Sequence, residues 1–130
     1  MEIMDISERF LNICKTQPET IAIDSQYDSN LRISYKELGE TVQNISQFLR
    51  KNSDIKTVAI VLKDKPSCYT SMLGCLDARR TYSPVNIDLP NDKINSILKK
   101  LSPDLIISSQ DIIERLDYDT NWVSYHDICV

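Results

Sequence analysis

The most informative segment of the chain reads Leu76-Asp77-Ala78-Arg79-Arg80-Thr81-Tyr82-Ser83-Pro84-Val85-Asn86-Ile87-Asp88-Leu89-Pro90-Asn91-Asp92-Lys93-Ile94. Proline fixes φ and interrupts regular structure, so Pro84 and Pro90 divide this segment. It predicts the end of a helix, a short strand over residues 81–86, a turn, and a new helix that begins at Asn91 or Asp92. Such close alternation of helix and strand is typical of a parallel α/β sheet.

The same alternation continues on both sides of this segment. The predicted strands are 57–62, 81–86, 104–109 and 122–125, and the helices between them begin near Pro66, Asn91 and Gln110. The strand over 57–62 is apolar almost throughout, as in a sheet that is covered on both faces. Right-handed crossovers then predict a three-layer α/β fold, with a mostly parallel sheet flanked by helices.

The first part of the chain predicts a β-hairpin between two helices. The elements, in order, are a helix capped by Asp5 or Ser7 and ended by Pro18, strands over 20–24 and 31–35 around a polar turn over 25–30, and a long helix. Ser34 and Glu37 fit a capping box, in which both side chains bind free amides at the start of that long helix. We expect the hairpin to attach at one side of the sheet.

Length and composition favour one soluble domain over residues 1–130. The chain has 130 residues, enough to bury a core, with 42% hydrophobic and 26% charged residues. A net charge of −4 gives no general attraction to nucleic acid or to an anionic membrane. No apolar run approaches the roughly 18 residues of a spanning helix, and the first residues are acidic, unlike a signal peptide. We expect a cytoplasmic protein without a nucleic-acid or membrane partner.

Glycine is scarce, and this limits the chemistry of the chain. Only Gly39 and Gly74 occur, and both fall within predicted helices. Loops that cradle phosphate need several glycines, because the backbone must approach the phosphate closely and adopt positive φ. Neither G-x-G-x-x-G nor G-x-x-x-x-G-K-(Ser/Thr) can be written here, so a nucleotide site of those kinds is excluded.

Cysteine and histidine form no metal-binding or catalytic pattern. The four cysteines, Cys14, Cys68, Cys75 and Cys129, include no Cys-x-x-Cys pair. Because a zinc site needs three or four converging ligands, we interpret them as reduced core residues. His126, the lone histidine, neighbours Asp127 on a predicted strand, where successive side chains point to opposite faces. Ser108 and Ser109 follow a strand but have no assignable base. We therefore assign no catalytic, cofactor-binding or metal-binding residue.

Two segments together resemble a known family. Leu76, Ala78, Tyr82, Pro84, Val85, Pro90 and Ile94 match the pattern Leu-Lys-Ala-Gly-x-Ala-Tyr-x-Pro-(Ile/Val)-Asp-x-x-x-Pro-x-x-Arg-Ile. Residues 31–38 are similar to an earlier Leu-(Thr/Ser)-Tyr-x-Glu-Leu element. Both belong to the N-terminal part of the adenylate-forming enzymes, most closely the amino-acid adenylation domains of nonribosomal peptide synthesis and the D-alanine-activating ligases. The resemblance covers about residues 5 to 109, in order.

The resemblance implies which chemistry to expect and where it is missing. Family members form an acyl-adenylate from a carboxylic acid, ATP and magnesium, using segments that lie further along the chain than any residue here. The chain thus resembles part of an ATP-dependent ligase, and alone it is expected to be inactive and to need no cofactor. The matching residues are expected to be structural: Tyr35, Glu37, Leu38, Tyr82, Pro84, Asn86, Pro90 and Lys93. Asn86 and Lys93 replace the family's Asp and Arg.

Two residues depart from the family pattern at the end of one helix. Arg79 stands at the usual glycine, where a left-handed conformation is common and costs a residue with a Cβ on the order of 1 kcal/mol. Asp77 replaces the usual lysine. Either the turn is built differently or selection on the motif has relaxed. We expect Arg79 to be exposed or partly buried, with its guanidinium in solvent or paired with a carboxylate.

Three functional hypotheses remain open on the sequence. The leading one is the N-terminal portion of an adenylation domain, as a truncated or split protein. The alternative is a non-catalytic interaction domain, derived from that fold, which binds a synthetase or carrier-protein partner. The third is a small flavodoxin-like binding domain with chance motif matches. Under the first, uncovered apolar surface or a sheet edge near 122–125 or Tyr82 predicts a homo-oligomer or a complementary adenylation polypeptide.

Overall fold

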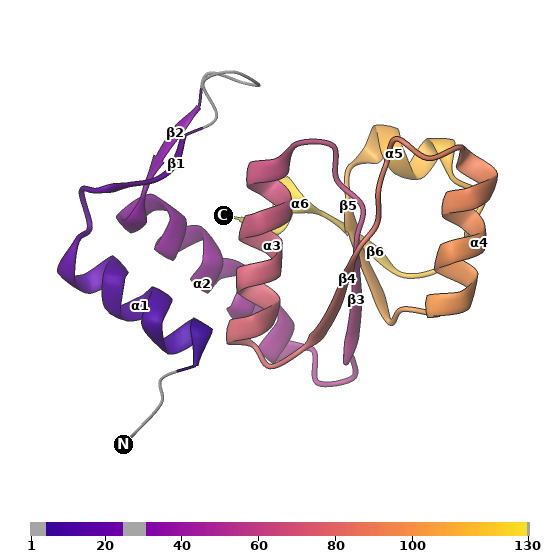
Figure 1. The fold of residues 1–130 in the computed structure, drawn as a ribbon. Helices are drawn as coiled ribbons and strands as arrows, with labels where there is room; N and C mark the ends of the chain where they lie inside the picture. Colours follow the sequence, from indigo (N-terminus) through magenta and orange to yellow (C-terminus); the bar gives the residue numbers. More distant parts are fainter. Residues whose placement is uncertain (1–4, 25–30, 130) are drawn as a thin grey trace.

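The computed structural model describes residues 5–24 and 31–129, which form six helices and six strands within those ranges (Figure 1). The elements are α1 (Ile6–Thr16), β1 (Ile21–Asp24), β2 (Arg32–Ser34), α2 (Tyr35–Lys51), β3 (Thr57–Ile60), α3 (Lys65–Asp77), β4 (Thr81–Pro84), α4 (Asn91–Leu101), β5 (Leu105–Ser108), α5 (Gln110–Arg115), β6 (Trp122–Ser124) and α6 (Tyr125–Ile128). The predicted turn over 25–30 lies outside the described residues.

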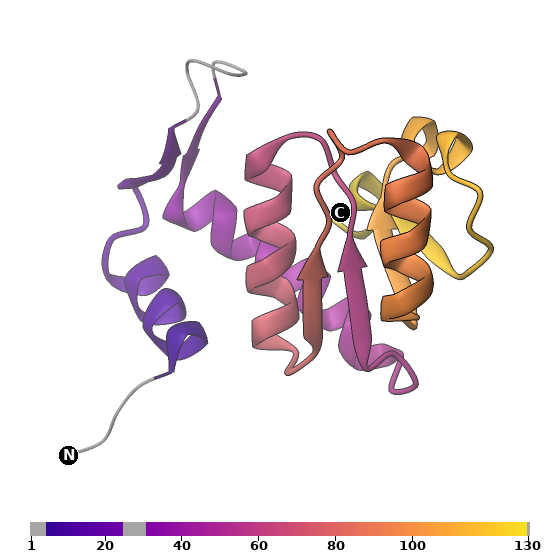
Figure 2. The same cartoon turned by 45° about the vertical axis from the view of Figure 1, so that its right-hand side comes forward.

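A parallel sheet with the strand order β4-β3-β5-β6 forms the centre of the fold. The chain runs outward from β3 to β4, then crosses back to β5 and continues to β6. Because right-handed crossovers in opposite directions place their helices on opposite faces, α3 covers one face and α4 and α5 cover the other. Figures 1 and 2 show this layering, with α2 beside α3. The predicted three-layer fold is confirmed.

The two faces of the sheet bury separate hydrophobic clusters. Alternate residues of β3 and β5, namely Val58, Ile60, Leu105 and Ile107, pack against α2, α3 and α6. The residues between them, Ala59, Val61 and Ile106, pack against α4 and α5 through Ile94, Leu98 and Ile112. Successive side chains on a strand point to opposite faces, so both faces of β3 need apolar residues. This confirms the interpretation of its apolar run.

The hairpin lies outside the central sheet. β1 pairs antiparallel with β2 in a sheet of two strands, against the expectation that the hairpin attaches to the main sheet. A third cluster, built on Phe10, Leu38 and Val42, joins the hairpin to α1 and α2. The chain ahead of β1 also accepts hydrogen bonds from the first amides of α2, at 2.9 Å from Tyr35 N to Thr20 O and 3.0 Å from Lys36 N to Pro18 O. These backbone bonds fix the hairpin to the helix.

Both glycines lie where helices approach closely. A Cβ on Gly39 would stand 2.9 Å from the Cys14 sulfur, so α2 can approach α1. A Cβ on Gly74 would stand 2.5 Å from Cγ2 of Ile45, so α3 can approach α2. Neither glycine has positive φ. Their role is therefore to allow close helix packing.

Arg79 occupies the left-handed position at the end of α3, with φ of 60°. Its amide donates to Leu76 O at 3.1 Å, and the Arg80 amide donates to Cys75 O at 2.8 Å, which is the Schellman pattern that usually has glycine at this position. The Arg79 side chain is 68% exposed, and its guanidinium lies 2.8 Å from a carboxylate oxygen of Asp5. The expectation of an exposed, carboxylate-paired Arg79 is confirmed.

The last predicted strand is shorter than expected. β6 ends at Ser124, and Tyr125 begins the single-turn helix α6. His126 and Asp127 are therefore exposed neighbours on a helix, and their placement on opposite faces of a strand is wrong. A single turn is too short to show helical periodicity in a sequence, which explains the error.

Candidate functional site

The carboxyl ends of the parallel strands form the edge at which open α/β sheets usually bind ligands. A groove of about 390 Å³ lies there, and its lining combines two cations, two carboxylates and three apolar side chains: Lys63, Arg115, Asp88, Asp111, Ile87, Leu89 and Ile112. The Arg115 guanidinium donates to the Asn91 side chain at 3.1 Å, which ties α5 to the start of α4. This groove is the candidate site that the topology selects.

Aspartates stand at the N-terminus of every described helix that begins at this edge. Asp64 caps α3 by accepting a 2.8 Å bond from the Ser67 amide, and Asp92, Asp111 and Asp127 lie in the first turns of α4, α5 and α6. The Ser109 hydroxyl, 2.6 Å away, holds the pKa of the Asp111 carboxyl below its usual range. Negative charge thus already occupies the positions where a helix would attract phosphate. These carboxylates disfavour a triphosphate at the helix ends, although Lys63 and Arg115 also line the groove.

The two serines that follow β5 are both engaged in structural bonds. The Ser108 hydroxyl is fully buried and donates to Val61 O at 2.6 Å, joining β5 to the residue that follows β3. The Ser109 hydroxyl donates to Asp111, whose lowered pKa makes it a poor base near neutral pH. Neither serine has the arrangement of an activated nucleophile.

The first set of motif residues lies at the start of α2. The Ser34 hydroxyl accepts the Glu37 amide at 3.2 Å and donates to the Glu37 carboxylate at 3.1 Å. The capping box predicted that the Glu37 carboxylate would bind a free backbone amide. It binds the Ser34 hydroxyl instead. The Tyr35 ring packs at a centroid distance of 6.4 Å from Phe10, and Leu38 is buried in the same cluster. All these contacts hold α2, α1 and the hairpin together.

The second set runs from β4 through a turn into α4. Tyr82 packs against the cluster under α3, and Pro84 ends the edge strand. The Asn86 side chain accepts the Asp88 amide at 2.9 Å, and Pro90 O accepts the amides of Lys93 and Ile94. Lys93 is exposed. The two sets lie on different elements (Figure 1), and among the described residues they share no hydrophobic cluster.

The four cysteines are all free, and burial, complete at Cys75 and partial at the others, lowers the reactivity of their thiols. Burial raises the pKa of the Cys75 thiol to about 12, and it also raises the pKa of the Cys14, Cys68 and Cys129 thiols. The thiolate is the reactive form, so a raised pKa lowers reactivity. Within residues 5–24 and 31–129, no group of three or more His, Cys, Asp or Glu side chains could hold a metal ion.

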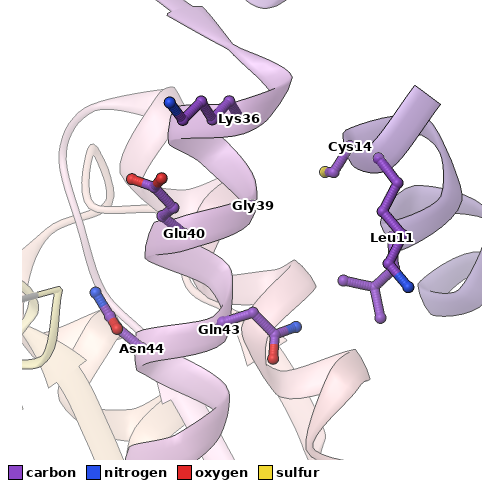
Figure 3. Close-up of a pocket in the computed structure, with 8 residues that line it drawn as sticks. Leu11, Cys14, Lys36, Gly39, Glu40, Gln43 and Asn44 are labelled. Atoms are coloured by element: carbon purple, nitrogen blue, oxygen red, sulfur yellow. The ribbon is translucent and has the colours of Figure 1, made fainter. Parts of the chain in front are cut away.

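A second hollow separates α1 from α2, with a volume of about 370 Å³ (Figure 3). Leu11 and Cys14 of α1 face Gly39 of α2 across it, and Lys36 and Glu40 lie along the α2 side. Gly39 contributes only backbone to the α2 wall of this hollow. Lys15, Gln43 and Asn44 also line it, so charged and amide groups border its apolar side chains.

Sequence reasoning missed the polar centre around Asp77. The Asp77 carboxylate accepts a 2.9 Å bond from the Ser7 hydroxyl and a 3.4 Å bond from Gln43, and it lies 3.5 Å from the Arg50 guanidinium. Its side chain is 9% exposed. The signal available in the sequence was the aspartate at the family's lysine position, but the partners, up to 70 positions away, could not be derived from it.

Comparison with known protein families gives a match to the AMP-binding enzyme model over residues 10–127. That range includes both motif segments and nearly all of the described fold. The chain belongs to the AMP-binding enzyme family. The resemblance based on residues 31–38 and 76–94 is thereby confirmed, and the flavodoxin-like hypothesis is replaced.

Individual relatives match over almost the whole chain but over little of their own length. Nonribosomal peptide synthetase sirP of Leptosphaeria maculans is 29% identical over 125 residues, which are 95% of this chain and 5% of that protein. A D-alanine--D-alanyl carrier protein ligase of Staphylococcus epidermidis is 23% identical over 85% of this chain and 21% of the ligase. The chain thus spans a small fraction of the relatives that it matches.

The fold also matches solved structures. The N-terminal subdomain of Klebsiella oxytoca NpsA, in complex with 3-hydroxyanthranilyl-AMSN, superposes with a TM-score of 0.82 at 23% identity, over 98% of this chain and 32% of that one. At this identity the likeness establishes the fold, which is that of the N-terminal part of an adenylation enzyme. In the described residues, no helix has the length and apolar composition to cross a membrane.

Proposed function

We propose that this chain is the N-terminal scaffold of an amino-acid adenylation domain of the nonribosomal peptide synthesis type, and that it forms no acyl-adenylate alone. The observation that carries the proposal is the family match over residues 10–127, together with separate matches that cover 5% of one relative and 21% of another. Residues 1–130 then act as a single subdomain. ATP and magnesium belong to the complete enzyme and not to this chain.

The arrangement at the carboxyl edge of the sheet supports the inactivity of the chain alone. A catalyst that transfers an adenylyl group must hold phosphates with preorganised donors or cations. Here the helix N-termini at that edge carry aspartates, and Ser108 and Ser109 are engaged in structural bonds. The motif residues serve as helix caps, turns and packing contacts, which suits a scaffold.

The partner under this proposal is a polypeptide that carries the remaining adenylation segments, or a synthetase or carrier protein that binds it. Relatives named as carrier protein ligases and synthetases support this class of partner. Four free thiols, of which Cys75 is buried and the other three are partly buried, suit a reducing compartment, which supports a cytoplasmic location. The interaction-domain alternative uses the same surfaces but needs no catalytic partner.

The test of this function is amino-acid-dependent exchange of pyrophosphate into ATP. The purified chain, assayed with magnesium and each common amino acid, is expected to match a blank without protein. Exchange that follows the chain through purification, and that depends on one amino acid, would overturn the proposal. A complete D-alanine carrier protein ligase serves as the positive control.

A further inference from the structure

The first helix, α1, buries few apolar side chains against the rest of the protein. Of the eleven residues of α1, only Ser7 and Phe10 are buried, while Ile6 is 65% exposed. One of the two buried residues is therefore polar. A helix of this length is marginal without tertiary contacts, so other interactions must hold α1 in place.

Two polar contacts hold the start of α1 against the end of α3. The buried Ser7 hydroxyl donates to Asp77 at 2.9 Å, and the Arg79 guanidinium lies 2.8 Å from Asp5, the residue that caps α1. The Glu8 amide, followed by the Arg79 guanidinium, holds the pKa of the Asp5 carboxyl below its usual range. Both contacts therefore act within the first turn of α1.

The charges of Asp77 and Arg79 favour the docking of the N-terminus of α1 against the end of α3. Asp77 places a carboxylate beside the first turn of α1, where the helix dipole is positive. Gln43 and Arg50 bind the other oxygen of the same carboxylate, so Asp77 remains satisfied and fixed in place by α2. Lysine at position 77, as in the family pattern, would bring positive charge to that end of α1. Glycine at position 79 would leave Asp5 without its guanidinium.

We infer that Asp77 and Arg79 form a two-point clamp that docks α1 onto the end of α3. The two departures from the family motif are then one adaptation, since each replaces a residue that could not bind α1. The left-handed backbone of Arg79 is energetically unfavourable, and the ion pair between its guanidinium and Asp5 offsets that cost. Docked in this way, α1 covers the apolar side of α2 at Leu38 and Val42.

The Cys14 thiol provides a direct probe of docking. Cys14 lies on α1 against Gly39 of α2 and is only partly buried, so it reacts faster when α1 separates from α2. The labelling rate of Cys14 by a maleimide, resolved from the other cysteines by peptide mass spectrometry, is measured for Ser7→Ala, Arg79→Ala and the double variant. Arg115→Ala removes an exposed arginine on α5 and is the matched control.

The clamp predicts several-fold faster labelling of Cys14 in each single variant, a larger increase in the double variant, and no change in Arg115→Ala. Arg79→Lys, which keeps the charge, restores slow labelling in part. Cys14 is also labelled faster in Arg79→Gly, because this variant loses the guanidinium even though glycine relieves the strain of the left-handed backbone. Amide exchange in β3 and β5, followed in every variant, establishes that the sheet stays folded. Wild-type labelling rates in the double variant and in Arg79→Gly would overturn the clamp.

Discussion

At the scale of single residues, the two glycines and Asp104 have the clearest measurable roles. Gly39 and Gly74 each remove a Cβ at a helix crossing, but the neighbouring atoms differ. At Gly39 the nearest atom is the sulfur of Cys14, whose side chain can rotate, while at Gly74 it is the β-branched side chain of Ile45 in the packed core. The same substitution therefore has different consequences at the two positions.

Gly74→Ala is expected to destabilise the fold by about 1–3 kcal/mol, because a core this tight cannot absorb a methyl group without shifts of side chains or backbone. Gly39→Ala is expected to cost less than about 1 kcal/mol, since alanine also favours the helix. Urea denaturation of both variants, fitted with a common slope, measures the difference. Equal losses of stability in the two variants would contradict this account of the crossings.

Asp104 gives the fold a dependence on pH. Hydrogen bonds from the amides of Lys56, at 2.8 Å, and Thr57, at 3.1 Å, hold the pKa of the Asp104 carboxyl below its usual range. A carboxyl whose pKa is lowered by folding stabilises the protein above its unfolded pKa, and this contribution is lost as the pH falls through the folded pKa. Acidification should therefore loosen the start of β3.

The expected result is that Asp104→Asn is less stable than the wild type near neutral pH, and that this difference shrinks as the pH falls from about 5 to about 3. Thermal denaturation midpoints across that range measure it. Asp54→Asn, at an exposed position in the loop before β3, controls for the loss of one charge. A difference between Asp104→Asn and the wild type that is constant with pH would refute the role of the carboxylate.

At the scale of elements, two arginines join the ends of α2 and α3 in a crossed arrangement. Arg80, which follows α3, donates to Leu49 O of α2 at 3.0 Å and to Ala78 O at 2.6 Å. Arg50 of α2 donates in return to Asp77 O of α3 at 2.6 Å. The last carbonyls of a helix lack partners within it, so each helix receives caps from the other.

Arg80→Lys is expected to lower the free energy of unfolding by about 1–3 kcal/mol, because an ammonium group cannot reproduce the fixed fork that reaches two carbonyls from different helices. Chemical denaturation measures the loss. Arg115→Lys, on the other side of the sheet, should change stability far less. Equal stability of Arg80→Lys and Arg115→Lys would show that the bonds from Arg80 to the helix-end carbonyls do not stabilise the fold.

Most elements could be predicted from the sequence, because their periodicity and caps agree with the tertiary structure. The apolar run of β3, the cap at Ser34 and the division at Pro84 and Pro90 each indicate a local structure directly. Two features could not be derived. The single turn of α6 is too short for periodicity, and the hairpin joins α2 through backbone bonds to Pro18 and Thr20, which leave no trace in side-chain patterns.

The groove at the carboxyl edge of the sheet could not be predicted residue by residue from the sequence. Where individual side chains lie depends on contacts between distant segments. Ser7 and Asp77 stand 70 residues apart, so no spacing rule joins them. Arg79 shows the same limit, since the sequence indicated a left-handed position but not Asp5 as its partner.

At the scale of the whole molecule, the two edges of the central sheet differ. Along a parallel strand, the polar groups of alternate residues point to the same side. The amides of Thr81 and Val85 donate to Lys56 O and Ile60 O on the β3 side, so the backbone N–H and C=O groups of the alternate residues, Tyr82 and Pro84, point away from the sheet. Pro84 has no N–H to offer a further strand. At the β6 edge, Asn121 O accepts the Ile106 amide, so the backbone N–H and C=O groups of Trp122 and Ser124 point away from the sheet. The β6 edge is better suited to pairing.

Self-association through β6 is therefore expected at high concentration, and Ser124→Pro should weaken it. Ser124 has φ of −74°, which proline adopts without strain, so the variant removes an outward N–H and keeps the fold. Light scattering after size-exclusion chromatography, over a range of concentrations, measures the mass. Pro84→Ala is the control on β4. A monomeric wild type at every concentration would rule out association.

The central claim, that this chain is a scaffold without a nucleotide site of its own, is tested most directly by calorimetric titration of the purified chain with magnesium and ATP. The expected injection heats equal those of nucleotide diluted into buffer without protein, up to millimolar ATP. The reason is that aspartates occupy the helix N-termini at the carboxyl edge of the sheet. A saturable isotherm with one nucleotide bound per chain would contradict it.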